Sequence, residues 1–299
     1  MAGKRTIRLK ETVPSQDVQR TPPDGYLAGT DGSISSGPWR LRSDRNGFIV
    51  TGNDVPVDHP GVLFLGDSFV ESMFIPESVR FVSGVERILN SRGVGVRCLN
   101  GGYSGTSTLQ LVNVLLNKVV PLVGCGGTVV FFVPQSDVPI FRSEASYWHL
   151  SDRYSPVIPP FEPEAAVMPK GQPATESLLR LAVTVAREFG ARLILVTSPY
   201  RYAPRDEDPY LARMLTVEAY NSMMRRRAAL GAAAVNVAAE TGVDFIDAMA
   251  AFMDHPEAFY DELHLNDEGQ AVFAEWLAGR LTPMLQDVGP LASTVVTGA

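Results

Sequence analysis

The amino-acid sequence predicts an α/β fold built on a parallel sheet, and three observations lead to this expectation. From Gly61 onward, short apolar and β-branched runs alternate with amphipathic stretches, which is the pattern of strands joined by crossover helices. Five of these runs have the length and composition of strands. The third and fourth runs are apolar almost throughout, which is typical of strands buried on both faces. We therefore expect a five-stranded parallel sheet in which these two strands are central.

The predicted strands and helices alternate along the chain. The strands are expected at Val62–Leu65, Val94–Leu99, Thr128–Val133, Leu193–Thr197 and Val243–Ile246. Between them, apolar residues recur at helical spacing, as in Val82, Val85, Ile88 and Leu89. Gly190 is placed to end one helix, and Asn266 or Asp267 is placed to cap the last one.

Outside this alternating region the composition changes. Residues 1–60 are rich in Pro, Gly, Ser and Asp, so we expect an N-terminal arm or loop-rich extension before an α/β domain at 61–285. Residues 286–299 are expected to form a flexible C-terminal tail. An irregular insertion, about 134–173, follows the third strand and contains Trp148, and long loops of this kind often bind ligands or act as lids.

Composition and charge exclude several classes of function. The net charge of −7 argues against a nucleic-acid-binding protein, because such a protein presents a basic face to phosphates. The run Arg225–Arg227 falls within a helical pattern and is interpreted as a solvated helix face. No stretch reaches the roughly 20 apolar residues of a membrane span. The N-terminus also lacks the apolar core of a secretory signal, so a cytoplasmic location is expected.

The cysteine count argues against a zinc site or a disulfide framework. Cys98 and Cys125 are the only cysteines in the sequence, and two thiols are too few for either, so both are interpreted as free. We therefore expect no metal and no organic cofactor. The expected partner is a small molecule or a saccharide, and no feature of the sequence indicates an oligomeric state.

A serine stands where the first predicted strand ends. The chain reads Gly66-Asp67-Ser68 directly after this strand, and ligands of open parallel sheets bind beyond the carboxyl ends of the strands. A serine at the start of the following helix is exposed at that edge, and the free N–H groups of the helix can stabilise a developing oxyanion. An ordinary helix cap is the alternative, so the interpretation depends on the presence of a base.

That base is supplied by a motif near the other end of the chain. Asp261 and His264 lie immediately before the last predicted helix. A serine hydroxyl is a weak nucleophile that needs a base within hydrogen-bond reach, and the base needs a carboxylate on its other nitrogen. This spacing across a turn can place the carboxylate beside the imidazole. Together with Ser68, the two residues predict a catalytic triad.

A glycine-rich stretch follows the second predicted strand. It contains Gly101, Gly102 and Gly105, which let the backbone approach a ligand closely and point N–H groups at it. Its spacing is not that of a dinucleotide fingerprint, and no such fingerprint follows the first strand. An ordinary strand-to-helix turn is the alternative interpretation.

These three segments together resemble blocks I, II and V of the SGNH/GDSL hydrolase superfamily, over roughly residues 60–285. The resemblance implies a flavodoxin-like three-layer α/β/α sandwich with a five-stranded parallel sheet, in agreement with the strands counted above. It implies that Ser68 is the nucleophile, Asp261 the acid and His264 the base. The backbone N–H groups of Ser68 and Gly105 would belong to the oxyanion hole.

The third block departs from the family pattern. Family members usually carry Gly-x-Asn-Asp after the third strand, with the Asn side chain as an oxyanion donor, whereas this chain reads Gln135-Ser136-Asp137. Ser136 occupies the position of the asparagine, so its hydroxyl or the Gln135 amide is expected to substitute for it. Loss of one donor typically costs about a hundredfold or more in rate, so low activity is one expected consequence. Asp137 is expected either to orient this loop or to cap a turn.

A looser resemblance concerns the mouth of the site. The segments Asn46–Ile49 and Glu144–Trp148 are similar to segments of bacterial SGNH proteins associated with surface-polysaccharide assembly. An aromatic side chain in the second segment could stack on a sugar ring, and an arginine after the fourth strand could bind an anionic substituent. The alternative for the aromatic side chain is ordinary packing, and the alternative for the arginine is a surface position without a ligand. The candidate substrate-binding residues are Asp67, Gln135, Trp148 and Arg201.

The expected function is a metal-free serine esterase that removes a small acyl group, most simply acetyl, from a carbohydrate or similar hydroxylated compound. An O-acyltransferase with the same triad is the nearest alternative, because a sugar hydroxyl can replace water as the acyl acceptor. A catalytically weak binding protein with the SGNH fold is a third alternative, suggested by the missing asparagine.

Overall fold

The computed structural model describes residues 4–56, 59, 61–123, 126–160 and 169–286. Its centre is a five-stranded parallel sheet of order β5-β4-β6-β8-β9. The strands are β4 (Gly61–Gly66), β5 (Arg97–Gly102), β6 (Thr128–Val133), β8 (Arg192–Thr197) and β9 (Asp244–Ile246). The predicted parallel sheet is therefore confirmed, and the third and fourth predicted strands, β6 and β8, are both interior.

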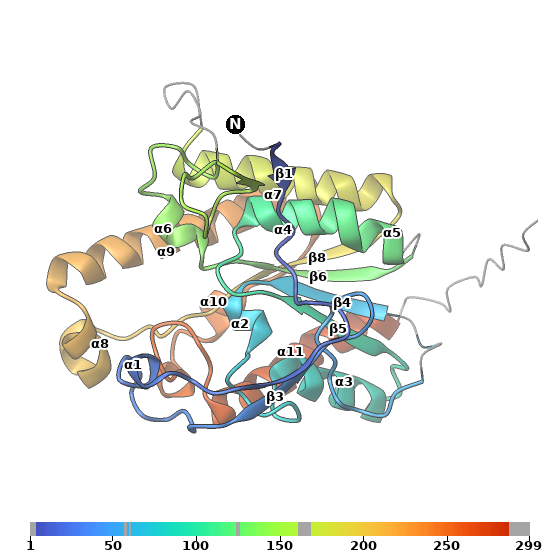
Figure 1. The fold of residues 1–299 in the computed structure, drawn as a ribbon, viewed down its shortest axis with the longest axis horizontal. Helices are drawn as coiled ribbons and strands as arrows, with labels where there is room; N and C mark the ends of the chain where they lie inside the picture. Colours follow the sequence, from blue (N-terminus) through green and yellow to red (C-terminus); the bar gives the residue numbers. More distant parts are fainter. Residues whose placement is uncertain (1–3, 57–58, 60, 124–125, 161–168, 287–299) are drawn as a thin grey trace, which may run out of the picture.

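Helices cover both faces of this sheet (Figure 1). On one face lie α3 (Phe81–Ser91) and α11 (Asp267–Gln286), and on the other lie α4 (Thr108–Val114), α7 (Gly171–Glu188) and α9 (Val217–Thr241). Side chains of a strand alternate between faces, so Val62 and Phe64 join the first core while Leu63 and Leu65 join the second. The result is the three-layer α/β/α sandwich that the resemblance implied.

Shorter elements complete the chain. The helices are α1 (Asp24–Leu27), α2 (Ser68–Glu71), α5 (Val120–Val123), α6 (Asp137–Ile140), α8 (Pro209–Met214) and α10 (Ala248–Ala251). A π-helical turn at Leu115–Val119 and 3-10 turns at Arg205–Glu207 and Pro256–Ala258 lie between them. Two antiparallel strand pairs join β2 (Asp17–Arg20) to β3 (Trp39–Arg42) and β1 (Thr6–Ile7) to β7 (Val157–Ile158).

The N-terminal residues pack closely against the α/β sandwich. Leu41, Phe48 and Ile49 are each at most 1% exposed. Ile49 exchanges backbone hydrogen bonds with Asn100 at the outer edge of β5. Because β1 pairs with β7, the start of the chain is also tied to the insertion that follows β6. Segments far apart in sequence thus meet along one side of the molecule.

The second strand begins later than its sequence predicted. The apolar run starts at Val94, but β5 begins at Arg97 and continues to Gly102. The Asn90 side chain supplies the reason, since its amide donates to the carbonyl oxygen of Val96 and its oxygen accepts from the Val96 N–H. The backbone before β5 is therefore bonded to the end of α3 and not to a neighbouring strand.

The interpretation of Arg225–Arg227, on α9, as a solvated helix face was wrong. Arg225 is exposed, as a solvated helix face requires, but Arg227 is only 3% exposed and its guanidinium lies 4.4 Å from the centroid of the Tyr200 ring. Successive residues of a helix are rotated by about 100°, so three consecutive arginines cannot share one face.

One of the two cysteines lies in the described part of the chain. Cys98 is a buried free thiol, and burial raises its pKa well above the usual range. Cys125 and the tail after Gln286 lie outside the described residues. Among the residues that are described, no helix is long and apolar enough to cross a bilayer, and no group of three or more His, Cys, Asp or Glu could hold a metal ion.

Candidate active site

Ser68 is the first residue of α2 and lies directly beyond the carboxyl end of β4. The turn into the helix is tight, and a Cβ atom on Gly66 would lie only 2.3 Å from Cγ2 of Val70. Glycine is therefore required at Gly66 for α2 to start so close to the strand. Asp67 caps the helix by accepting a hydrogen bond from the Phe69 N–H at 3.1 Å.

The loop before α11 brings Asp261 and His264, the candidate acid and base, to Ser68. Nε2 of His264 lies 2.7 Å from Oγ of Ser68, and Nδ1 of His264 lies 2.7 Å from Oδ2 of Asp261. The other Asp261 oxygen accepts from the N–H groups of Leu263 and His264, both at 2.7 Å. The structure therefore joins Ser68 to the distant pair Asp261 and His264 in one hydrogen-bonded chain.

Two contacts hold this loop in shape. The Tyr260 N–H donates to the carbonyl oxygen of His264 at 2.9 Å, which closes the loop into a narrow turn. The Tyr260 ring also stacks on the imidazole of His264, with centroids 5.5 Å apart and planes 16° apart. Together they fix the plane of the imidazole between its two partners.

The electrostatics of the pair favour a charged imidazole. Burial by itself lowers the pKa of His264, but the charge and hydrogen bond of Asp261 outweigh it, so the pKa lies above its ordinary value. Burial likewise raises the pKa of Asp261, and the opposing effects of His264 are stronger, so the carboxyl pKa lies below its usual range. An imidazolium that forms by taking a proton from serine is stabilised by this arrangement.

Gly105 lies in the turn between β5 and α4 with a φ angle of 70°, a conformation that favours glycine. Its neighbourhood is fixed on both sides. Ser104 donates from its N–H and its hydroxyl to Glu71 of α2, and Ser107 forms a capping box with Gln110 at the start of α4. The backbone of this turn is thereby held beside the helix that carries Ser68.

Ser136 and Asp67 bond to one another. One carboxylate oxygen of Asp67 accepts from the N–H and from the hydroxyl of Ser136, both at 2.9 Å, and Asp67 is fully buried. The Ser136 hydroxyl is thus engaged with a carboxylate in this structure. Asp67 acts as a brace between the ends of β4 and β6.

Asp137 and Gln135, on either side of Ser136, also make internal contacts. Asp137 accepts from the N–H and hydroxyl of Thr108 and from the hydroxyl of Tyr147, so it orients the loop, which was one of its two expected roles. Burial raises the pKa of Asp137 to about 7. Gln135 is buried and its amide donates to the Ser198 carbonyl oxygen at 2.8 Å.

Arg201 does not face the serine. It is 8% exposed and forms ion pairs with Asp31 at 2.6 Å and Asp208 at 2.7 Å. Its guanidinium also donates to the carbonyl oxygen of Phe259, and its backbone N–H donates to the carbonyl oxygen of Glu262. Arg201 therefore braces the loop that carries Asp261, and its charge is already neutralised by two carboxylates.

Trp148 is partly buried and packs against a small core cluster that includes Tyr147 of the insertion and Leu178 of α7. It does not line the cavity beside Ser68, and neither do Asp67, Gln135 or Arg201. The four candidate substrate-binding residues are thus engaged in packing or internal bonds.

A small cavity of about 120 Å³ opens beside Ser68 and His264. Its other walls come from residues that the sequence analysis did not identify, including Tyr26, Phe74, Ser104, Arg153 and Tyr260. Tyr26 belongs to the N-terminal segment, and its hydroxyl lies 3.0 Å from that of Tyr260. Phe74 follows α2 closely in sequence, so its proximity could have been inferred, but Tyr26 and Arg153 arrive through tertiary contacts that no local motif encodes.

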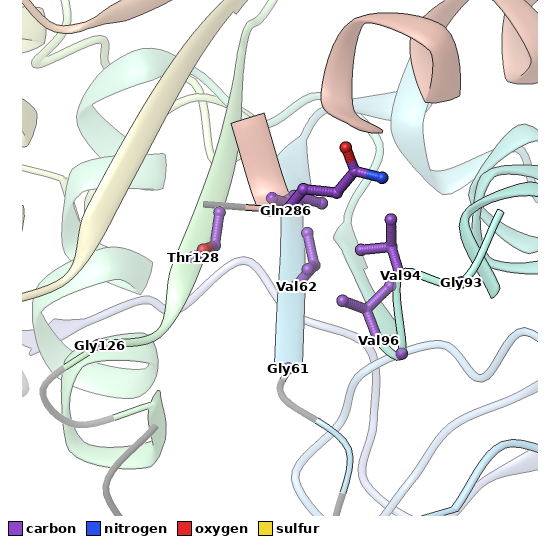
Figure 2. A pocket seen from close by; sticks show the side chains of 10 residues that line it. Gly61, Val62, Gly93, Val94, Val96, Gly126, Thr128 and Gln286 are labelled. Atoms are coloured by element: carbon purple, nitrogen blue, oxygen red, sulfur yellow. The ribbon is translucent and has the colours of Figure 1, made fainter. Parts of the chain in front are cut away.

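A larger hollow lies at the opposite end of the sheet, at the amino ends of the strands (Figure 2). It has a volume of about 320 Å³ and is lined by glycine, valine and leucine with Thr128 and Gln286. None of the described lining residues titrates, so the described part of the chain places no acid or base in this hollow. Of these two cavities, the smaller one at the carboxyl edge is the one lined by ionisable side chains.

Comparison with known proteins gives structural but not sequence relatives. No family model and no curated protein matches the chain. A catalytic serine-to-alanine mutant of Axe2, an acetylxylan esterase from Geobacillus stearothermophilus, matches with a TM-score of 0.50 and 20% identity, covering 74% of this chain and 94% of that one. The acetyl xylan esterase AlAXEase matches with a TM-score of 0.51 and 16% identity, covering 74% of this chain and 99% of that one.

These likenesses define the class of fold. The chain is an α/β sandwich of the type found in esterases, and more particularly it has the SGNH/GDSL hydrolase fold that the sequence resemblance implied.

Proposed function

We propose that the protein is a serine esterase that hydrolyses a small acyl ester of a saccharide or a similarly hydroxylated compound. The observation that carries this proposal is the hydrogen-bonded chain from Asp261 through His264 to Ser68, with 2.7 Å at both links, beside a cavity. These distances are those expected of a nucleophile, its base and the group that orients the base.

The reaction follows from this geometry. Oγ of Ser68 attacks the ester carbonyl carbon while Nε2 of His264 takes the hydroxyl proton. The N–H groups of Ser68 and Gly105 donate to the oxyanion, and Asp261 stabilises the imidazolium. Collapse of the tetrahedral intermediate breaks the bond to the alcohol, which receives the proton from Nε2. Water activated by His264 then releases the acid and restores Ser68.

The size and lining of the cavity support a short acyl group. A volume of about 120 Å³ is well below the roughly 300–1,000 Å³ of sites that enclose a whole drug-sized ligand. Phe74 meets Tyr26 edge to face with ring centroids 4.9 Å apart, and Ile75 is buried beside them. Two of the structural neighbours are described as acetylxylan esterases, which agrees with an acetyl ester of a saccharide as the substrate class.

We expect the ratio kcat/KM to fall by about tenfold or more from p-nitrophenyl acetate to the butyrate, since one or two methylenes that do not fit a pocket have effects of this size. Steady-state hydrolysis of an acyl-length series measures it. Phe74→Ala should reduce the difference in kcat/KM between the two esters, because it removes a ring from the wall of the cavity. Phe189→Ala, which alters an exposed ring on another surface, should leave it unchanged. A rate that rises with acyl length would contradict a short-acyl site.

Product analysis tests hydrolysis against acyl transfer. With an acetylated saccharide as donor and an added saccharide as acceptor, hydrolysis releases acetate and alcohol in equal amounts. Acyl transfer would yield an acylated acceptor and less free acetate than alcohol, and that result would replace the esterase proposal with an O-acyltransferase that uses the same residues.

A further inference from the structure

An arginine from the insertion after β6 lies over the turn that carries Gly105. A Cβ atom on Gly105 would lie 3.0 Å from Nε of Arg153 and 3.6 Å from its Nη2. Arg153 also lines the cavity that contains Ser68 and His264. A guanidinium is therefore placed beside the candidate nucleophile, at the mouth of the same cavity.

This guanidinium has no counter-ion within the part of the chain that the structure describes. Its aromatic contact is with Tyr154, whose ring centroid lies 5.5 Å away, and no carboxylate stands within ion-pair distance. Arg201, in contrast, has two carboxylate partners. Arg153 is exposed at the cavity, so its charge is open to a ligand.

A second cation, Lys10, lies close enough to Arg153 for the two charges to repel one another. Lys10 is only 3% exposed, and its ammonium lies 5.4 Å from the ring centroid of Tyr103 in the Gly105 turn. Burial, together with the positive charges of Arg8 and Arg153, lowers the pKa of Lys10 to about 8, against a smaller opposing effect of Glu71. Glu71 is itself bonded to Ser104. Glu71 thus offsets only part of the positive charge on this side of the cavity, and burial raises its own pKa.

The position of these cations is built into the fold. Arg8 donates to the carbonyl oxygen of Asp152, next to Arg153, and β1 pairs with β7 just after it. The N-terminal strand therefore fixes the turn of the insertion that carries the guanidinium and brings Lys10 beside it. Two segments separated by about half of the chain thus place Arg153 at the cavity and Lys10 near it.

We propose that the substrate carries a negative charge on its alcohol portion and that Arg153, with Lys10 beside it, binds that charge. This inference rests on the proposed esterase function of Ser68. The apolar walls at Phe74 and Ile75 suit an uncharged acyl group, because an ionised group there would lose its hydration without a partner. The charge then belongs to the other side of the ester, where a carboxylate, phosphate or sulfate can pair with a planar guanidinium.

Two esters of similar shape test the proposal: 3-acetoxybenzoate, whose alcohol portion is charged, and 3-acetoxybenzamide, whose alcohol portion is neutral. We expect the wild-type protein to prefer the benzoate in kcat/KM by about tenfold. Arg153→Gln should bring the ratio of the two rates close to one, and Arg153→Lys should restore part of it. Arg142→Gln, an arginine of the same insertion that bonds to Ser222, should leave the ratio as in the wild type.

A binding measurement separates this inference from the esterase proposal. Calorimetric titration of the Ser68→Ala protein with each ester should show about tenfold tighter binding of the benzoate, and the additional Arg153→Gln change should remove the difference. Equal binding of the two esters, or a preference that survives Arg153→Gln, would overturn the inference even if Ser68-dependent hydrolysis is observed. Preferential binding of the benzoate without Ser68-dependent hydrolysis would support the anion site and count against the esterase proposal alone.

Discussion

Replacement of Ser68 by alanine is expected to lower kcat for p-nitrophenyl acetate by about 10⁴-fold or more, because it removes the atom that forms the acyl-enzyme in the proposed mechanism. The hydroxyl lies 2.7 Å from Nε2 of His264, so no other serine can use the same base without a rearrangement. Stopped-assay hydrolysis, corrected for the spontaneous rate of this activated ester, measures the effect.

The matched control is Ser78→Ala, which removes an exposed serine hydroxyl on the chain between α2 and α3. It should retain the wild-type rate. Circular dichroism and the thermal midpoint Tm establish that each variant is folded. If folded Ser68→Ala and the wild type hydrolyse the ester at equal rates, Ser68 is not the nucleophile.

Replacement of Asp261 by asparagine is expected to lower kcat by about 10³ to 10⁴-fold, although the shape of the side chain is conserved. An asparagine amide would donate to Nδ1 of His264 in place of the present hydrogen bond at 2.7 Å. Nδ1 would then act as acceptor and Nε2 would carry the proton, so the imidazole could no longer take the proton of Ser68.

The pH dependence adds a second readout for the same substitution. The proposed mechanism requires neutral His264, so kcat/KM should rise with pH through the pKa of this histidine. In the wild type, Asp261 keeps that pKa above 6.5 against the effect of burial, and the midpoint of the acid limb should lie above 6.5. In Asp261→Asn burial prevails, and the midpoint should move to lower pH. Glu257→Gln, which alters the exposed partner of His255, should change neither quantity, whereas an unchanged profile in Asp261→Asn would exclude the proposed role of Asp261.

The sheet and the site residues with local motifs were predictable from the sequence for a physical reason. A strand buried on both faces must be apolar throughout, as in β6 and β8, so composition alone identifies it. Ser68 and the pair Asp261 and His264 each belong to short motifs at the end of a strand or before a helix. Because the carboxyl ends of parallel strands share one edge, topology was enough to predict that the two motifs meet.

The walls of the cavity were not predictable in this way. Arg201 follows a strand at the correct edge, yet Asp31, from the N-terminal segment, pairs with it, and no local pattern reveals a partner at that separation. Arg153 and Tyr26 lie at the cavity because of equally distant contacts. Strand pairing and the packing of the N-terminal segment bring them there. Ser136 was expected to face an oxyanion. Its hydroxyl donates instead to Asp67, because a fully buried carboxylate needs hydrogen-bond donors.

The most direct test of a nucleophilic Ser68 is covalent labelling by a fluorophosphonate, read by intact mass and peptide mapping. The wild-type protein should gain one adduct, on Ser68, with displacement of fluoride. Labelling should be lost in Ser68→Ala and strongly slowed in His264→Ala, and it should persist in His255→Ala, which removes an exposed histidine paired with Glu257. An adduct on another residue, or equal labelling of wild type and Ser68→Ala, would contradict the assignment of this site as a serine esterase.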